Sequence, residues 1–276
     1  MNGNILKMRC TLGDAENDQA VQYQLPVGDE LLPMNEFIGR AIKLTYNGEI
    51  NCVACGRKTK KSFAQGHCYP CFRRLASCDM CIMKPETCHY AQGSCRQPEW
   101  GEANCFIPHY VYLANSSGIK VGITRGTQIP TRWIDQGASQ ALPVFKVSNR
   151  LQSGLLEVVL KQHISDRTDW RKMLKAEVGP LPLKDVRDEL LAKCADEITT
   201  IKNQQGEDSI QLIDEEVVQI KYPVECYPEK IKSLNLDKQV EIEGTLLGIK
   251  GQYIILDTGV LNIRKYSGYN IEVDFV

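Results

Sequence analysis

The sequence lacks any run of 18 apolar residues, although 43% of its 276 residues are hydrophobic. That absence argues against a membrane-spanning helix. The opening residues, Met1 to Lys7, also lack the apolar segment of a secretory signal. Cysteine pairs at metal spacing fit a reducing compartment better than a disulfide framework. We therefore expect a cytoplasmic protein with no membrane partner.

Net charge is also nearly absent, because 33 Lys and Arg face 34 Asp and Glu. No overall electrostatic field therefore identifies a partner. Internal repeats and low-complexity tracts are missing as well. A chain of this length can bury a full core and divides most naturally into two or three folded units.

Cysteine, in contrast, is concentrated in one stretch. Nine of the twelve cysteines lie between Asn51 and His109. The first four form two Cys-x-x-Cys pairs, Cys52 with Cys55 and Cys68 with Cys71. Four thiolates so spaced can surround one Zn²⁺ at about 2.3 Å in a tetrahedron. We predict a zinc ribbon or treble-clef module here, with zinc as its cofactor.

The remaining cysteines of this stretch have looser spacings. We predict a second zinc site from four of them, with His89, Cys105 and His109 as substitute ligands: Cys78, Cys81, Cys88 and Cys95. An iron–sulfur cluster is the alternative, although the compact ferredoxin run that ends in Cys-Pro is absent. Unligated thiols are the third interpretation.

The same stretch is basic, with no Asp or Glu from Asn51 to Ser77. Cations gain free energy by releasing counterions from a phosphate backbone, so DNA or RNA is the expected partner. The candidate nucleic-acid-binding residues are Arg57, Lys58, Lys60, Lys61, Arg73 and Arg74. A solvated loop that compensates the zinc–thiolate charge would have the same composition. Lys250, Arg264 and Lys265 offer a second basic patch.

Alternation, glycines and turn signals indicate an α+β fold in five segments. We expect a β-rich segment over 1–50, the cysteine-rich zinc module over 51–107, and an α/β domain over 108–180. An acidic helical connector follows over 181–222, with one helix from about Leu183 to Thr200. Strict alternation over 223–276 predicts a small β-barrel-like domain.

Local signals refine two of these segments. Asn47-Gly48 after Ala41 to Tyr46 predicts a hairpin turn. His109 to Ala114 and Ile119 to Thr124 predict a second hairpin, followed by a helix near Pro130 that ends at Gly137. A strand over 142–147 then precedes a helix that Ser153 is placed to cap, with Glu157 at the edge of its apolar stripe.

Several residues of these elements resemble those of a known nuclease domain. Val111-Tyr112-Leu113, Lys120-Val121-Gly122-Ile123-Thr124, Arg132 and Glu157 resemble the GIY-YIG nuclease domain over about 108–170. Nearly the whole chain is similar to the family known as domain of unknown function 2797, which joins a cysteine-rich module to such a domain. In that nuclease family two tyrosines, an arginine, often a histidine and a metal-binding glutamate surround the scissile phosphate.

The resemblance implies an endonuclease that cleaves phosphodiester bonds with a divalent ion. Its catalytic residues would be Tyr112, Lys120, Arg132 and Glu157, with Mg²⁺ or another divalent ion at Glu157. Arg132 would clamp phosphate oxygens and Tyr112 would relay a proton. Lys120 replaces the second tyrosine, and Gln136 stands where many members have histidine. The alternative is a non-catalytic adaptor that binds RNA or a ribonucleoprotein through a degenerate nuclease domain.

Overall fold

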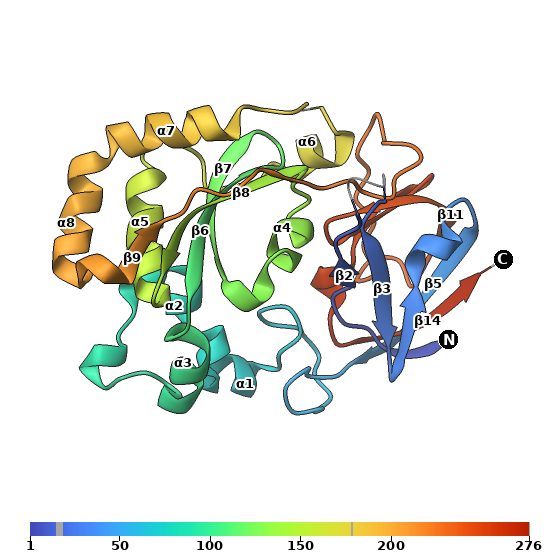
Figure 1. The fold of residues 1–276 in the computed structure, drawn as a ribbon. Coiled ribbons are helices and arrows are strands. Elements are labelled where there is room, and N and C mark those ends of the chain that lie inside the picture. Colours follow the sequence, from blue (N-terminus) through green and yellow to red (C-terminus); the bar gives the residue numbers. More distant parts are fainter. Residues whose placement is uncertain (15–18, 178, 276) are drawn as a thin grey trace.

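The strands of the protein form three sheets. The computed structural model describes residues 1–14, 19–177 and 179–275 (Figure 1). A five-stranded sheet with its helices occupies one half of the molecule, and the β-rich part occupies the other (Figure 1). The cysteine-rich segment lies along the lower edge of that view. The chain is therefore a mixed α/β structure, as predicted.

The five-stranded sheet is built around the predicted hairpin. Its strands are β6 (His109–Asn115), β7 (Ile119–Arg125), β8 (Gln140–Val147), β9 (Ile210–Leu212) and β10 (Val218–Gln219). β6 lies between β7 and β8, and both pairings are antiparallel. Gly118, at a φ of +121°, completes the turn between β6 and β7. The register places Tyr112 opposite Gly122 and Ala114 opposite Lys120.

The two faces of this sheet belong to different cores, because successive strand residues point to opposite sides. Val111 and Leu113 pack into a core with α5 (Arg150–Leu160), α7 (Leu183–Lys193) and α8 (Ala195–Gln205). Tyr112 and Ala114 enter a second core, which α4 (Thr131–Asp135) and the β-rich half share. Tyr112, Gly122 and Lys120 therefore face the β-rich half.

Two helix predictions were wrong in detail. α5 begins at Arg150, and its N-cap is Asn149, whose side chain accepts the backbone N–H of Gln152 at 3.0 Å while the Gln152 side chain accepts that of Asn149. This reciprocal cap satisfies two free donors, so Ser153 lies inside the helix and does not cap it. The single helix predicted from Leu183 to Thr200 is broken at Cys194 into α7 and α8.

The predicted C-terminal barrel is an open sheet. Its six strands are ordered β1 (Asn2–Asn4), β14 (Tyr269–Phe275), β5 (Ala41–Ile50), β11 (Glu241–Lys250), β12 (Tyr253–Leu256) and β13 (Gly259–Asn262). β5 separates β11 from β14, and the edge strands β1 and β13 do not meet. A separate three-stranded sheet contains β2 (Arg9–Thr11), β3 (Gln22–Val27) and β4 (Glu30–Pro33).

Asn47-Gly48 does not form the predicted hairpin turn. β5 runs through it without reversing, and Gly48 has a φ of +76°. Opposite this point the register with β14 shifts, because Tyr46 pairs with Ile271 while Ile50 pairs with Tyr269. A bulge and a tight turn need the same left-handed glycine, so the dipeptide alone does not distinguish them.

The cysteine-rich segment contains the short helices α1 (Tyr69–Arg74) and α2 (Met80–Met83), and α3 (Pro98–Cys105). It packs directly on α5, since an added Cβ at Gly154 would lie 2.6 Å from Pro85 Cβ and 2.7 Å from the Glu86 nitrogen. Only glycine allows this approach. The helix α5 and the cysteine-rich segment are therefore packed in direct contact.

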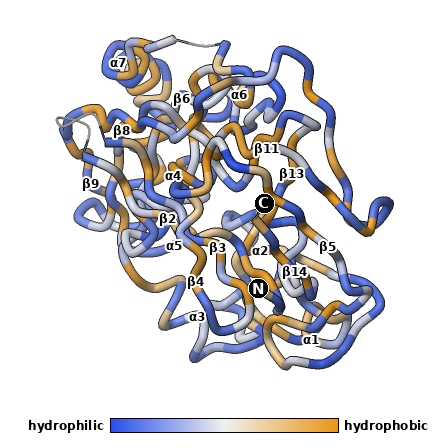
Figure 2. Tube along the Cα trace, turned by 90° about the vertical axis from the view of Figure 1, so that its right-hand side faces the viewer, coloured by the Kyte–Doolittle hydropathy of each residue, from blue (hydrophilic) through white to orange (hydrophobic). Residues whose placement is uncertain are grey.

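The remaining helices cover the outside. α6 (Trp170–Lys175) stacks its Trp170 ring on Tyr253 at 5.6 Å between centroids. Along α7 hydrophobic and hydrophilic residues alternate, as expected of a helix with one buried face (Figure 2). Among the described residues, no helix has both the length and the apolar character to span a bilayer.

The contact of α5 with the cysteine-rich segment gives a stability prediction. Gly154→Ala should lower the free energy of unfolding by about 1–2 kcal/mol, because steric overlap with Pro85 and Glu86 outweighs alanine's helix propensity. Urea unfolding followed by circular dichroism measures this. Gly179→Ala is the control, since no atom lies within 4 Å of its added Cβ. Equal unfolding free energies for the two variants would contradict the packing described here.

Candidate active-site cleft and metal centres

The first metal centre is formed by Cys52, Cys55, Cys68 and Cys71. Their sulfurs all lie within 4.8 Å of one another, and the Cys55 and Cys68 sulfurs are 3.8 Å apart. Tetrahedral zinc with 2.3 Å bonds requires a separation of about 3.8 Å. Cys68 is the N-cap of α1 and Cys71 lies in its first turn, with Pro70 between them.

The thiols of this group also have the electrostatics of a metal site. Burial raises the pKa of Cys52, but backbone N–H groups of Cys68, Ala54 and Cys55 outweigh it, so the pKa is lowered. Hydrogen bonding to Cys55 and burial raise the pKa of Cys71. One thiolate thus opposes ionisation of the next unless a cation neutralises them. The group can hold a metal ion such as zinc.

A second group of cysteines surrounds a small, largely apolar cavity. Its lining includes Cys81, Cys88, Cys95 and Cys105, together with Trp100 and Phe106. This set differs from the predicted ligands in one residue, because Cys105 lines the cavity and Cys78 does not. Cys78 lies instead on the side of Cys52, whose charge acts on its thiol.

A cleft of about 330 Å³ lies where the main parts of the molecule meet. It is lined by Lys7 of the N-terminal segment, Ile82, Met83 and Pro85 of the cysteine-rich segment, and Arg264 near the C-terminus. The five-stranded sheet and its helices complete it. Three of the four predicted catalytic residues line this cleft: Lys120 from β7, Arg132 from α4 and Glu157 from α5.

Tyr112, the fourth, is fully buried beneath the cleft. Its hydroxyl accepts a hydrogen bond from Gln136 Nε2 at 2.9 Å, and Gln136 lines the cleft. The ring lies against Gly122, where an added Cβ would be 2.7 Å from the hydroxyl oxygen. Burial raises the pKa of Tyr112, although the Arg132 guanidinium opposes the rise. The phenol is therefore neutral at physiological pH and able to donate a hydrogen bond.

Lys120 is the most unusual cation of the cleft. Its side chain is 6% exposed and has no carboxylate at ion-pair distance among the described residues. Burial and the nearby Arg132 lower the pKa of Lys120 to about 8, while Glu157 and Asp166 act in the opposite direction. A pKa of about 8 leaves roughly one tenth of the Lys120 amine uncharged at pH 7 and about half at pH 8, and the uncharged form can act as a general base.

Further cations gather around it. Arg125, Arg132 and Arg150 line the same cleft, and none has an ion pair within the described part of the chain. Arg150 donates to the Ile82 carbonyl at 2.6 Å, but its buried Nε has no hydrogen-bond partner. The buried Gln136 Oε1 is also unpartnered. Unpaired guanidinium groups favour an anionic ligand, whereas the Gln136 oxygen is an acceptor that requires a hydrogen-bond donor.

Three acidic residues, Asp135, Glu157 and Asp166, line the same cleft. Burial and the neighbouring Asp166 raise the pKa of Glu157. Asp135 is already occupied, because its carboxylate accepts from Lys7 Nζ at 2.7 Å and from Gln252 Nε2 at 2.8 Å. Lys7, and not Arg132, is therefore the close ion-pair partner of Asp135.

Sequence reasoning did not identify several cleft residues. Lys7, Arg125, Arg150 and Asp166 carry no motif, and only the fold brings them together. His109, considered as a substitute imidazole or ligand, is fully buried and hydrogen-bonds to the Ile107 carbonyl. Burial lowers the pKa of His109 to about 4. It does not line the cleft.

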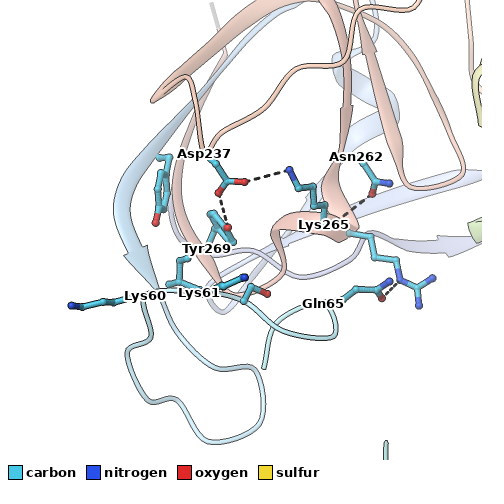
Figure 3. A pocket seen from close by; sticks show the side chains of 11 residues that line it. Lys60, Lys61, Gln65, Asp237, Asn262, Lys265 and Tyr269 are labelled. Carbon is cyan, nitrogen blue, oxygen red and sulfur yellow. Dashed lines mark hydrogen bonds and ion pairs between the residues drawn. The ribbon is translucent and has the colours of Figure 1, made fainter. Parts of the chain in front are cut away.

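A basic pocket of about 610 Å³ adjoins the cleft (Figure 3). Arg264 lines both, and Lys60, Lys61 and Lys265 add three further cations. Figure 3 shows Asp237 bonded to Lys265 and to the Tyr269 hydroxyl, at 3.3 and 2.7 Å. Tyr46 and Tyr269 also line this pocket. Lys250 is not part of this patch, because it is buried beside Tyr222 and Tyr227.

The six predicted nucleic-acid-binding residues are all exposed, but they do not share one surface feature. Only Lys60 and Lys61 line the basic pocket. Lys58 pairs with Glu49 at 2.7 Å, and Arg73 and Arg74 lie in the last turn of α1. Arg57 follows the first cysteine pair, and its carbonyl accepts the Cys52 N–H.

The first metal centre gives a direct prediction. Cys68→Ser should remove about one zinc ion per chain, because three ligands no longer close the tetrahedron. It should also expose residues 51–77 to protease, since binding energy at such a site is folding energy. Metal analysis and limited proteolysis measure both. The control is the exposed Cys226→Ser. Unchanged zinc in Cys68→Ser would refute the assignment of these four ligands.

Comparison with known proteins gives one match. The family model described as "Protein of unknown function (DUF2797)" matches residues 39–271, which run from just before β5 into β14. Searches of the curated proteins and of the solved structures found no match. The family model covers most of the chain, including the four-cysteine group and every cleft residue except Lys7. The chain therefore belongs to the DUF2797 family.

Proposed function

We propose that this protein binds nucleic acid and cleaves its phosphodiester bonds with a divalent ion, using a GIY-YIG-like site. The observation that carries the proposal is the shared cleft of Lys120, Arg132 and Glu157 above the buried Tyr112. These residues are distant in the sequence and belong to four different elements. A phosphate in the cleft would meet three arginines that have no ion pair with any described carboxylate.

The arginines would bind the substrate. Arg132, Arg125 and Arg150 present planar guanidinium groups, which hold phosphate oxygens in pairs. Their charge would also stabilise the extra negative charge of the transition state. Tyr112 and Gln136 would orient Arg132 from below, because the Tyr112 hydroxyl contacts both side chains. Gln136 would thereby take the place of the histidine that many GIY-YIG nucleases have at this position.

Lys120 is the residue best suited to accept a proton from the attacking water. Tyr112 is a poor base, because burial raises its pKa. The pKa of Lys120 is lowered to about 8, so its amine is partly free near neutral pH. The departure from the tyrosine of the nuclease motif would therefore replace one base with another.

Glu157 and Asp166 fit a divalent ion, since burial and the charge of the neighbouring Asp166 raise the pKa of Glu157 and a cation would relieve both effects. Such an ion would polarise the phosphate and stabilise the leaving oxygen. Mg²⁺ accepts one or two carboxylates with water as the remaining ligands. The zinc at Cys52, Cys55, Cys68 and Cys71 would be structural, in a treble-clef-like module that presents Lys60 and Lys61 to the substrate.

The basic pocket would extend the binding path. Arg264 belongs to both the pocket and the cleft, so a strand held in the cleft can continue toward Lys61 and Lys265. Tyr46, which is half-buried, offers a ring on which an unpaired base can stack, whereas Tyr269 is buried. A second candidate function is binding without cleavage, which the same cations support.

A cleavage assay tests the proposal. Purified protein with labelled single- and double-stranded DNA and RNA should cut at least one substrate with Mg²⁺ or Mn²⁺, and EDTA should stop it. Glu157→Gln should lower the rate roughly 10²-fold or more, the cost of losing one charge-stabilising group. Glu197→Gln on α8 is the matched control and should retain the full rate.

The outcome separates the two functions. Binding measured by fluorescence anisotropy without cleavage under any divalent ion would leave the adaptor as the function. Cleavage that is equal in Glu157→Gln and Glu197→Gln would indicate a contaminating nuclease and would refute the proposed site.

The dependence of the rate on pH tests Lys120. A base with a pKa of about 8 is active when deprotonated, so the single-turnover rate should rise about five-fold from pH 7 to pH 8. Lys120→Arg should keep most of the substrate affinity but lose cleavage, because guanidinium stays protonated. A Lys120→Arg variant that cleaves with the same rising profile would show that another group is the base.

A further inference from the structure

The second half of the cysteine-rich segment has no hydrophobic core of its own. The structure describes every residue from 76 to 106, and the buried ones among them are Ala76, Pro85 and Gly101. None of these three has a large apolar side chain. The secondary structure of the segment is limited to α2, α3 and three-residue turns of 3₁₀ helix. A segment that buries so little apolar surface needs a cross-link to hold one structure.

Side chains with metal-binding donors take the place of that core. They surround a cavity of about 20 Å³. A single water molecule needs roughly 10–15 Å³ of such space, so the cavity has room for one ion and not for an iron–sulfur cluster. Six residues with donor atoms line it: Asp79, Cys81, Cys88, His89, Cys95 and Cys105.

Three of these donors already lie close enough together to bind a single ion. One ligand atom each from Asp79, Cys81 and His89 lies within 4.8 Å of the other two. A tetrahedral zinc ion with the usual bond lengths separates its ligand atoms by roughly 3–4 Å. Asp79 Oδ2 and His89 Nε2 have this separation, because they are 3.4 Å apart.

The imidazole of His89 is oriented as in a metal ligand. Its Nδ1 lies 2.9 Å from Ser94 Oγ, and that hydroxyl donates its own hydrogen to the His89 carbonyl at 3.2 Å. Nδ1 is therefore the donor of the pair, which leaves a lone pair on Nε2 of the neutral ring. That lone pair faces the Asp79 carboxylate. Two acceptors in this position repel each other unless a cation lies between them, and a bound metal ion would be that cation.

Asp79 is held in place by groups that do not line the cavity. Its Oδ1 accepts the Met80 N–H at 2.6 Å, and its Oδ2 accepts Arg96 Nε at 2.8 Å. Arg96 also donates to the carbonyls of Phe72 and Leu75 at the end of α1, at 3.1 and 3.3 Å. Outer hydrogen bonds of this kind orient a ligating carboxylate. Zinc bound by one carboxylate and two thiolates has one negative charge in excess, which the guanidinium would balance.

We propose that this cavity is a second zinc site, in which Asp79, Cys81 and His89 bind one ion. Another cysteine of the same cavity completes the tetrahedron. The ion is structural and fixes α2, whose Ile82 carbonyl accepts Arg150 Nη2 at 2.6 Å. Ile82 and Arg150 both line the cleft, so the ion supports its wall. This inference does not depend on the cleavage activity.

Metal analysis of the full chain, purified without chelator, tests the proposal. We expect about two zinc ions per chain in the wild type and about one in Cys81→Ser and in His89→Gln. Cys78→Ser and His163→Gln are the matched controls and should keep both ions, because neither residue lines the cavity. A wild type with a single zinc ion overturns the proposal, and so does a second ion that persists in His89→Gln.

Limited proteolysis shows which centre has lost its ion. Cys81→Ser should be cut first within residues 76–106, whereas Cys68→Ser should be cut first within residues 51–77. A Cys81→Ser variant that is cut first within residues 51–77 would place Cys81 at the first centre and overturn the proposal. If Cys81→Ser does not fold, the zinc contents of the wild type and of His89→Gln decide the question.

Discussion

Positive charge held out of water without a carboxylate partner is the constraint on which the centre of this molecule depends. Lys120, Arg132 and Arg150 line one cleft, and none of them has an ion pair within the described residues. A buried cation without a counter-charge is costly, and the lowered pKa of Lys120 records that cost. Real proteins depart from the rules of stability mainly at functional sites. A phosphate bound in the cleft would supply the missing negative charge.

Short-range signals in the sequence were sufficient for much of the architecture. The β6–β7 hairpin, the glycine that ends α4 and the first four cysteines follow from local spacing and turn chemistry. Each depends on residues fewer than about twenty positions apart, where few alternative geometries exist. Tyr112, Arg132 and Glu157 could be selected because the family resemblance fixes their order. Their common cleft is a property of the fold, which spacing alone does not give.

Other features could not be predicted, because they depend on contacts between distant segments. Lys7 and Arg264 reach the cleft only because β1 and β14 share a sheet with β5. The insertion of β5 between β11 and β14 also explains why the C-terminal strands form no barrel. The role of Gly48 could not be predicted for a different reason, since a left-handed glycine fits a bulge and a turn equally well. Cys105 was separable from Cys78 only by its place around a cavity.

The position of β5 also determines how long this strand remains unpaired while the chain is synthesised. Its partner β11 begins about 190 residues after β5 ends, a delay of roughly 10–40 s at 5–20 residues per second. Throughout that interval a ten-residue strand with apolar Ile42 and Leu44 has no neighbour on either edge. Unpaired edges of this kind recruit other chains. The strand β5 is therefore exposed to pairing with other chains until translation delivers β11 and β14, which enclose it.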